Sequence, residues 1–296
     1  MKRHLLLLVV VLTSLLLTVH LSMAKEFRVG LMPAKESLPF YAEERYGIFK
    51  KHGIELVIVP FRSALERDSA YEAGKIDGSI SDIVAVALLV KGGRNIKILR
   101  TIAKPRKGYP VFTVLKAGRA TSSKEIAISF NTVIEYVTDR ILEKQNMGGM
   151  LKKTEIKSVP LRMQLLTEGK IGYATLAEPL ATFAGIKGAE RVYTDEGIKG
   201  SHVVFVARGD LGDRFLKSLA AAFDEACARA NKEKVLLKEL LWLKLSLPAE
   251  LKDAYSLPDL RIKELPAKQD VNDVLSWMQQ RGLIRERIPY ERLVFR

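Results

Sequence analysis

The chain has 296 residues, of which 48% are apolar and 28% are charged, values typical of a folded globular protein without low-complexity tracts. Its 48 basic residues exceed its 34 acidic residues for a net charge of +14, but they are spread along the chain and aromatic residues make up only 7%, a pattern that does not favour nucleic-acid binding. The single cysteine, Cys227, has no partner for a disulfide or a CxxC motif and is expected to be a buried thiol.

Residues 1–24 predict a secretory signal peptide. Lys2 and Arg3 precede an apolar run at 5–21, and Ser22 and Ala24 are the small residues expected before a cleavage site. Because the apolar run is longer than a usual signal core, an uncleaved membrane anchor is the alternative. No cysteine near Ala24 could carry a lipid. The sequence thus predicts a soluble exported protein, most simply in a bacterial periplasm, with 46 basic against 34 acidic residues and a net charge of +12 after cleavage.

Strands and helices alternate through the first part of the mature chain. A Ser/Pro loop follows a first strand and opens a helix, for which Gly47 and Gly53 supply stop signals. The pattern predicts strands at 27–32, 55–59, 76–81, 95–103 and 111–115, with helices at 39–52, 63–74 and 83–93. The strand at 55–59, ELVIV, is of the buried type. This alternation is typical of a parallel sheet covered by helices.

Two stretches in this region resemble the type II periplasmic solute-binding proteins of ABC importers, in the group that binds alkanesulfonates, taurine, nitrate and aminopyrimidines. LPFYAEERYGIFKKHGIEL at 38–56 resembles the pattern P-x-Y-x-A-x-E-x-G-x-F-x-K-x-G-I-x-V, and YEAGKID at 71–77 resembles A-x-x-x-G-x-I-D. The resemblance continues to WMQQRGLI at 277–284. It implies an α/β fold of two lobes, each a mostly parallel sheet flanked by helices, with two crossover strands as the hinge. It also implies that residues 25–115 and 206–296 form lobe I and residues 116–205 form lobe II.

The second part of the chain repeats the alternation. Strands are predicted at 125–129, 154–159, 170–175, 189–195 and 201–210, with helices at 130–149, 161–169 and 177–185 and further helices after residue 210. The tripeptide Gly-Lys-Ile occurs at 74–76 and again at 169–171, each time between a predicted helix and a predicted strand. The same helix-to-strand connection is therefore expected in both lobes. The family usually has Asp after the second of these tripeptides, whereas this chain has Gly172, but its Glu-Pro pair is kept at Glu178 and Pro179.

The candidate ligand-binding residues lie where strands end, because open α/β sheets bind ligands beyond the carboxyl ends of their strands. They are Ser37, Pro39, Phe40, Arg62, Ser79, Ser81, Asp82, Ser129, Asn131, Thr132, Glu178 and His202.

Each of these residues also has a purely structural interpretation. Phe40 could belong to the core of a helix, and Asp82 or Ser81 could cap the next helix. Thr132 and Glu135 have the spacing of a capping box. A carboxylate such as Glu178 is favoured at a helix start by the macrodipole.

The sequence predicts binding rather than catalysis. Only His52 and His202 remain after the signal segment, and no GxSxG, HExxH, P-loop or GxGxxG motif is present, so neither a cofactor nor a metal is expected. The predicted function is a monomeric receptor that closes on a small solute and delivers it to an ABC importer permease, without a nucleic-acid partner. Hydroxyl and amide groups at two helix starts, with Arg62, favour a sulfonate or carboxylate on an anionic or zwitterionic solute, although a hydroxyl-rich cleft also suits a pyrimidine.

Two other functions are compatible with the same fold. Relatives in the aminopyrimidine branch make the pyrimidine that serves as a thiamine precursor, but that chemistry implies histidine and lysine in the site and a cysteine-rich segment, which a chain with one cysteine lacks. The third possibility is a sensor module that reports its bound state to a membrane partner, which the sequence does not separate from a transport receptor.

Overall fold

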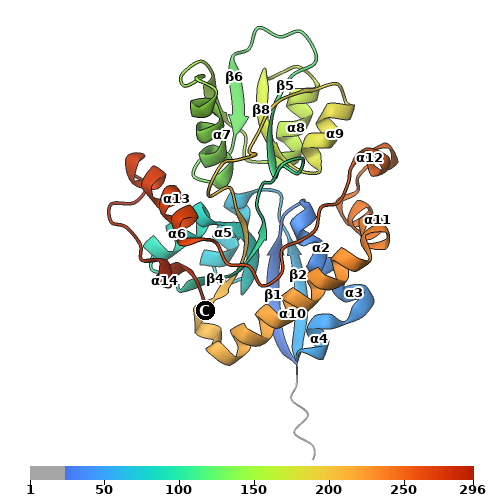
Figure 1. Ribbon diagram of the computed structural model, residues 1–296, viewed down its shortest axis with the longest axis vertical. Coiled ribbons are helices and arrows are strands. Elements are labelled where there is room, and N and C mark those ends of the chain that lie inside the picture. Colours follow the sequence, from blue (N-terminus) through green and yellow to red (C-terminus); the bar gives the residue numbers. More distant parts are fainter. Residues whose placement is uncertain (1–23) are drawn as a thin grey trace, which may run out of the picture.

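The computed structural model describes residues 24–296, so the predicted signal peptide lies outside the described residues except for Ala24. Two five-stranded sheets, each flanked by helices, form an upper and a lower body, and the chain passes between them twice (Figure 1). This α/β two-lobe architecture confirms the predicted fold class. Within residues 24–296, no helix combines the length and apolar character that a membrane crossing needs.

The sheet of the first lobe has the order β2-β1-β3-β10-β4. Its strands are β1 (Lys25–Leu31), β2 (Ile54–Pro60), β3 (Gly78–Asp82), β4 (Ile96–Ala103) and β10 (Val203–Arg208). β2 and β3 pair with β1 in parallel, whereas β10 runs antiparallel to both of its neighbours.

The sheet of the second lobe has the order β7-β6-β8-β5-β9, which matches the first sheet position by position. Its strands are β5 (Phe112–Lys116), β6 (Glu125–Ile128), β7 (Lys152–Glu155), β8 (Tyr173–Ala177) and β9 (Glu190–Thr194). Here β5 is the strand that runs antiparallel to both neighbours. In each sheet, the strand that stands fourth in the sheet order, β10 or β5, therefore follows directly after a segment that crosses between the lobes.

The sheets place the ends of the lobes a few residues away from the expected boundaries. β5 was expected to close lobe I at residue 115, but its backbone pairs with β8 and β9 of the second sheet. β10 begins at Val203, before the expected return at residue 206, and pairs with β3 and β4. Strand pairing is a long-range property, which the local pattern of a strand does not reveal.

β2 is a sheet edge, not the buried strand that its ELVIV composition predicted. Among the described strands only β1 pairs with it, and of its seven residues Ile54 alone is buried. β3 is the fully buried strand, because it lies at the centre of the first sheet and all five of its residues are covered.

The helix predicted at 39–52 is broken into α2 (Leu38–Tyr41), α3 (Glu43–Tyr46) and α4 (Ile48–Lys51). Gly47 separates α3 from α4 in a left-handed conformation with φ of +57°, which a residue without a Cβ adopts at low cost. Gly47 is thus confirmed as a helix stop. Phe40 on α2 packs with Phe49, Phe205 and Phe223 in the core of the first lobe.

The helices that follow strands begin at side-chain caps. Asp82 accepts a hydrogen bond from the amide of Ala85 (2.9 Å) at the start of α6 (Ile83–Lys91), as expected. Thr132 accepts one from the amide of Ile134 (3.1 Å) at the start of α7 (Val133–Lys144), while Glu135 accepts from the amide of Asn131 (2.8 Å). Both residues of the predicted capping box therefore accept hydrogen bonds at this helix start, but from the amides of Ile134 and Asn131, so the reciprocal pair of bonds of a capping box is not formed.

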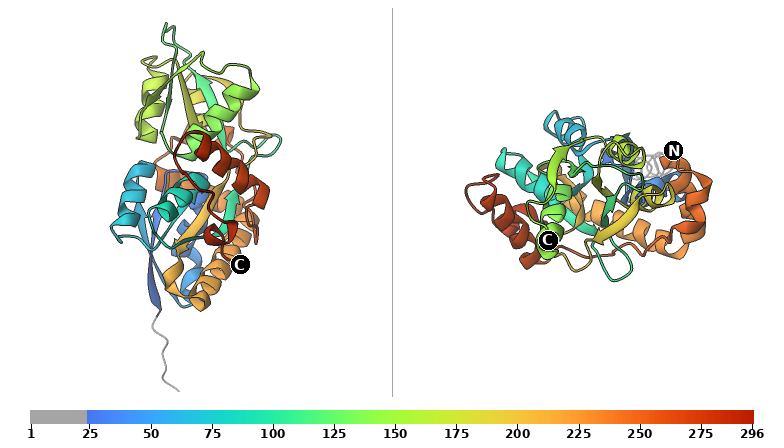
Figure 2. Two further views of the ribbon diagram at one scale, coloured as in Figure 1. Left: turned by 90° about the vertical axis from the view of Figure 1, so that its left-hand side faces the viewer. Right: turned by 90° about the horizontal axis from the view of Figure 1, so that it is seen from above.

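The C-terminal helices return to the first lobe and cover it (Figures 1 and 2). They are α10 (Asp213–Lys232), α11 (Lys234–Leu245), α12 (Ala249–Ala254), α13 (Lys268–Gln280) and α14 (Tyr290–Leu293). α10 places Phe223 and Cys227 in the core, and both side chains are fully buried. Cys227 is therefore the buried thiol that the sequence predicted.

The crossing segments at 104–111 and 195–202 are tied together by Asp195. Its carboxylate accepts hydrogen bonds from the amide of Val111 (3.0 Å) and from Ser201 Oγ (2.6 Å). Burial raises the pKa of Asp195 to about 6. The two segments thus form one hydrogen-bonded strap between the lobes.

Candidate ligand-binding cleft

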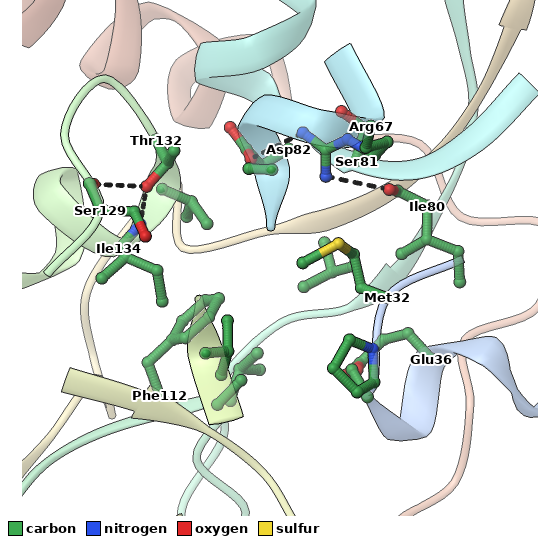
Figure 3. Close-up of a pocket in the computed structure, with 18 of the residues that line it drawn as sticks. Met32, Glu36, Arg67, Ile80, Ser81, Asp82, Phe112, Ser129, Thr132 and Ile134 are labelled. Carbon is green, nitrogen blue, oxygen red and sulfur yellow. Dashed lines mark hydrogen bonds and ion pairs between the residues drawn. The ribbon is translucent and has the colours of Figure 1, made fainter. Parts of the chain in front are cut away.

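A cavity of about 90 Å³ lies between the lobes, at the ends of the central strands. Asp82, Ser81 and Arg67 of the first lobe gather on one side of it, and Ser129 and Thr132 of the second lobe lie on the other (Figure 3). Most of the remaining wall is apolar. The cavity thus has the composition of a small-molecule site, an apolar enclosure with a few polar groups.

Two helices, one from each lobe, bring an arginine to this cavity. α5 (Ala64–Glu72) follows β2, and α8 (Val159–Thr167) follows β7, the strand at the equivalent position of the second sheet. A serine caps each helix: Ser63 accepts a bond from the amide of Glu66, and Ser158 accepts one from the amide of Leu161. The fourth residue of each helix is an arginine, Arg67 in α5 and Arg162 in α8.

The arginines belong to a repeated unit longer than the Gly-Lys-Ile tripeptide. Gly74 stands seven positions after Arg67, and Gly169 stands seven positions after Arg162. The start of α8 also contacts the segment just before α5 across the cleft, because the amide of Val159 donates a hydrogen bond to the carbonyl of Arg62 (3.3 Å). Equivalent parts of the two lobes therefore face each other at the cavity.

Arg67 is neutralised within its own lobe. Its Nε and Nη2 donate to the two carboxylate oxygens of Asp68 (2.8 and 3.1 Å), and Nη2 lies 3.8 Å from Asp82 Oδ2. Its Nη1 donates to the carbonyl of Ile80 (3.1 Å). Glu36, the other carboxylate of the cavity wall, lies 2.8 Å from Lys35 Nζ. The acidic groups of the wall thus already have basic partners.

Arg162 has no such partner. Its side chain is 0% exposed, and only Nη1 donates a hydrogen bond, to Ser129 Oγ (3.1 Å). Within residues 24–296, Nε and Nη2 are buried without an acceptor, as is the hydroxyl of Ser81. Burial lowers the pKa of Arg162 to about 10, so the side chain remains charged at neutral pH. A buried cation with free donors is strongly unfavourable unless an anion completes it.

The repeat explains why only one of the two arginines is unpaired. Alignment on the Gly-Lys-Ile tripeptides places Met163 where the first lobe has Asp68, and Ala177 where it has Asp82. Both acids that neutralise Arg67 are therefore replaced by uncharged residues beside Arg162. Ala177 itself lines the cavity.

Asp82 reduces the negative charge of the cavity further. Burial raises its pKa to about 6, against the opposing effect of the Arg67 guanidinium. Part of the Asp82 population is therefore protonated near neutral pH. The charged residues of the cavity wall are two arginines and two acids, and among the described residues Arg162 is the one of them without a partner of opposite charge.

Four of the predicted site residues come together at the cavity: Ser81, Asp82, Ser129 and Thr132. Asp82 and Thr132 also cap helices, so the structural interpretation is confirmed for these two positions, and their ligand-binding role stays a prediction.

The other predicted residues lie elsewhere. Ser37, Pro39 and Phe40 are buried in the first lobe, where Ser37 Oγ donates to the carbonyl of Met32 (2.7 Å). Ser79 is buried in β3 but does not line the cavity. The Arg62 side chain is exposed, and only its carbonyl takes part in the contact between the lobes.

Asn131, Glu178 and His202 also lie outside the cavity wall. Asn131 lines a neighbouring groove. Glu178 forms an ion pair with Arg191 and accepts a hydrogen bond from Thr182 Oγ1 (2.7 Å). His202 is buried in the strap, with Nε2 3.1 Å from Asp270 Oδ2.

The strand ends of the sequence predicted Arg62 as the candidate arginine, whereas Arg67 and Arg162, which line the cavity, lie inside helices. A helix side chain points back toward the N-terminus of its helix, so a long residue one turn into a helix reaches the strand end beneath it. The equal spacing from each arginine to Gly-Lys-Ile was the available signal. Within the described residues, no group of three or more His, Cys, Asp or Glu residues is arranged to hold a metal ion.

Comparison with known proteins rests on structure, because no family model and no curated protein gives a significant match to the sequence. The alkanesulfonate-binding protein from Xanthomonas axonopodis pv. citri, bound to MOPS, has a TM-score of 0.75 and 15% identity over 92% of this chain and 98% of that chain. The periplasmic nitrate-binding protein from Synechocystis PCC 6803 has a TM-score of 0.65 and 13% identity over 77% and 69%.

A Candida albicans protein with the generic periplasmic binding protein fold has a TM-score of 0.68 and 12% identity, over 89% of this chain and 92% of that chain. All three similarities extend across both lobes. The chain therefore has the two-lobe fold of the periplasmic binding proteins, as the resemblance in its sequence implied.

Proposed function

We propose that this protein is the substrate-binding component of an ABC-type importer, which captures a small organic anion between its lobes and delivers it to a membrane permease from the periplasm. Arg162 is the observation that carries this proposal. It is a fully buried cation at the junction of the lobes, with two guanidinium nitrogens that have no acceptor within the described residues. An anionic head group would supply those acceptors.

The geometry favours a compact head group. One buried water molecule needs about 10–15 Å³ of cavity volume, so a cavity of about 90 Å³ has room for about six to nine waters. A sulfonate or carboxylate with a short chain fits this space, and its oxygens can accept from Arg162 Nε and Nη2 together, the bidentate arrangement that arginine forms with such groups. Ser81 Oγ is a further donor on the opposite lobe. The two bacterial neighbours described above are binding proteins for alkanesulfonate and nitrate, which are also anions.

Binding can be tested by titration calorimetry and thermal shift with methanesulfonate, butanesulfonate, taurine, MOPS, nitrate, butyrate and an aminopyrimidine. Native mass spectrometry of protein purified without refolding identifies any ligand that is retained. We expect at least one sulfonate or carboxylate to bind reversibly without chemical change, and Arg162→Met to abolish this binding. If the aminopyrimidine binds and every anion fails, the proposal is wrong.

A second variant tests the role of the missing acids directly. Ala177→Asp places a carboxylate where Asp82 stands in the first lobe, so it should neutralise Arg162 from within the protein. Anion affinity should fall at least tenfold, since the ligand then competes with an internal carboxylate for the guanidinium. Thr175→Ser is the matched control: this buried residue of the same strand, β8, lies outside the cavity wall, and the substitution adds no charge. An Ala177→Asp protein that folds and still binds anions with parental affinity would contradict the assignment of Arg162.

A further inference from the structure

The cavity that holds Arg162 also contains two buried carboxylates. Asp82 and Glu36 line its wall, and these residues are only 3% and 1% exposed. A head group that fills about 90 Å³ therefore lies against hydrogen-bond acceptors as well as donors. The ionised oxygens of a sulfonate accept hydrogen bonds but donate none, so such an anion requires donors alone. The binding of a fully ionised anion thus does not explain the two carboxylates.

The carboxylate of Asp82 is held at one of its two oxygens. Its Oδ1 accepts the hydrogen bond from the amide of Ala85 (2.9 Å), whereas Oδ2 lies 3.8 Å from Arg67 Nη2, which is beyond hydrogen-bond distance. Asp82 lies next to Ser81 on the side of the cavity opposite the second lobe (Figure 3). An oxygen of a head group in the cavity can therefore approach Asp82 Oδ2.

Two anionic oxygens at hydrogen-bond distance need a proton between them, because each charge opposes the ionisation of the other group. Asp82 is able to hold this proton, since burial raises its pKa to about 6. On α5, Arg67 opposes this shift and Asp68 adds to it. The other charged groups around Asp82 are Glu36, paired with Lys35; Glu135 of α7, paired with Lys153; His202 beside the start of β10, paired with Asp270; and Arg162, which the anion neutralises.

We infer that the head group binds with one proton held between Asp82 and one of its oxygens, so that the receptor selects an oxyanion that carries its own O–H, a phosphonate or a phosphate monoester. This inference rests on the proposed function and names the class of its ligand. A phosphate monoester loses its second proton with a pKa of about 6, so near neutral pH its O–H can donate to Asp82 while its other oxygens accept from Arg162 and Ser81. A sulfonate carries no proton at this pH and has to draw one onto Asp82. Phe112 and Ile134 in the wall suit a short alkyl substituent.

The test compares methanesulfonate with methylphosphonate, which share a tetrahedral shape and differ in the proton. We would measure both affinities by calorimetry between pH 6 and 8, in two buffers of different ionisation enthalpy, for the parent and for Asp82→Asn. At pH 7 the parent should bind methylphosphonate at least about tenfold more tightly, the effect of one unfavourable buried polar contact. Its affinity for methanesulfonate should fall by up to about tenfold for each pH unit above about 6, with uptake of a proton on binding.

Asp82→Asn should remove both effects. This variant retains a helix cap, and its amide can donate to a sulfonate oxygen, so the preference for methylphosphonate should fall to about twofold or less and methanesulfonate binding should no longer depend on pH. Methyl phosphate and inorganic phosphate are measured in the same way, and the phosphorus oxyanion that binds most tightly identifies the source of the head group.

Glu286→Gln is the control, because Glu286 is an exposed carboxylate outside the cavity wall, and this variant should behave like the parent. Methanesulfonate that binds as tightly as methylphosphonate, without uptake of a proton, would overturn the inference. So would a preference for methylphosphonate that persists in Asp82→Asn. In either case the proposed function stands if both anions bind and Arg162→Met abolishes their binding; if no anion binds the parent, the proposed function and the inference both fail.

Discussion

Replacing Arg162 with methionine should stabilise the ligand-free protein while it removes the response to anions. The two effects have opposite signs because the same charge is unfavourable in the empty site and favourable in the occupied one. Buried ionic groups that are replaced by apolar residues of similar size often leave a protein equally or more stable. The long, flexible methionine side chain can fill the volume of the arginine stem.

The expected size follows from the pKa of Arg162 and its single hydrogen bond. A decrease from 12.5 to about 10 by burial alone corresponds to about 3 kcal/mol of lost solvation of the charged form, at about 1.4 kcal/mol per tenfold change. The lost bond to Ser129 subtracts about 1 kcal/mol. The variant should therefore gain about 2 kcal/mol in its free energy of unfolding. At about 2–4 °C per kcal/mol, the midpoint temperature should rise by about 4–8 °C.

Urea unfolding and thermal melts of ligand-free protein measure this change, and Arg67→Met is the matched control. Arg67 is equally buried, but its removal leaves Asp68 and Asp82 without their cation, so this variant should lose about 3–5 kcal/mol. If Arg162→Met is destabilised like Arg67→Met, Arg162 is a structural arginine with a partner in solution. Its assignment as the ligand anchor would then be wrong.

Three further predictions follow from other parts of the structure. The folded protein holds the proton of Asp82 more tightly than the unfolded chain does, so ionisation of this carboxyl lowers the free energy of unfolding as the pH rises from about 4 to 6. Asp82→Asn removes this loss and retains a helix cap. In urea unfolding, its free energy of unfolding should therefore rise relative to that of the parent by up to about 3 kcal/mol between pH 4 and 7. Gly172→Ala should lose about 1–3 kcal/mol in calorimetry, because its Cβ would lie 2.0 Å from the carbonyl oxygen of Ser123. Trp277→Phe removes the hydrogen bond from Nε1 to Asp139 Oδ2 (3.1 Å), so X-ray scattering should show a larger radius of gyration without ligand, and anion affinity should fall by about two- to fivefold.

Features that depend on a few consecutive residues could be read from the sequence. The caps at Asp82 and Thr132 and the stop at Gly47 need only local spacing and the steric freedom of glycine. Gly172 shows where such an explanation ends. Its departure from the family pattern was visible, but its cause was not, because the close approach of Ser123 is a tertiary contact.

Features that depend on pairing between distant segments were not readable in the same way. The membership of β5 in the second sheet is set by its hydrogen bonds to β8 and β9, not by its composition. Phe40 follows a strand end, as a ligand contact would, yet it packs against Phe49 and Phe205. The absence of a counterion for Arg162 required knowledge of what surrounds Met163 and Ala177.

The contacts between the lobes are of a size that can balance the unpaired charge of Arg162. Away from the cavity, Arg281, directly after α13, lies 2.6 Å from Glu135 Oε1 of α7, and the Trp277 indole donates a hydrogen bond to Asp139. Closer to the cavity, the Val159 amide donates one to the Arg62 carbonyl. At about 1 kcal/mol each, these three contacts offset the roughly 3 kcal/mol that burial of the cation costs.

The carboxylates of α7 also have a partner that does not depend on closure. Lys153, in the same lobe, lies 3.0 Å from Glu135 Oε1 and 2.9 Å from Asp139 Oδ1, so opening the lobes does not strand either acid. Without ligand, the closed arrangement is therefore neither strongly favoured nor strongly opposed. A bound anion converts the one large unfavourable contribution into a favourable one, and a population shift of this kind is how ligand occupancy can control lobe closure in a receptor.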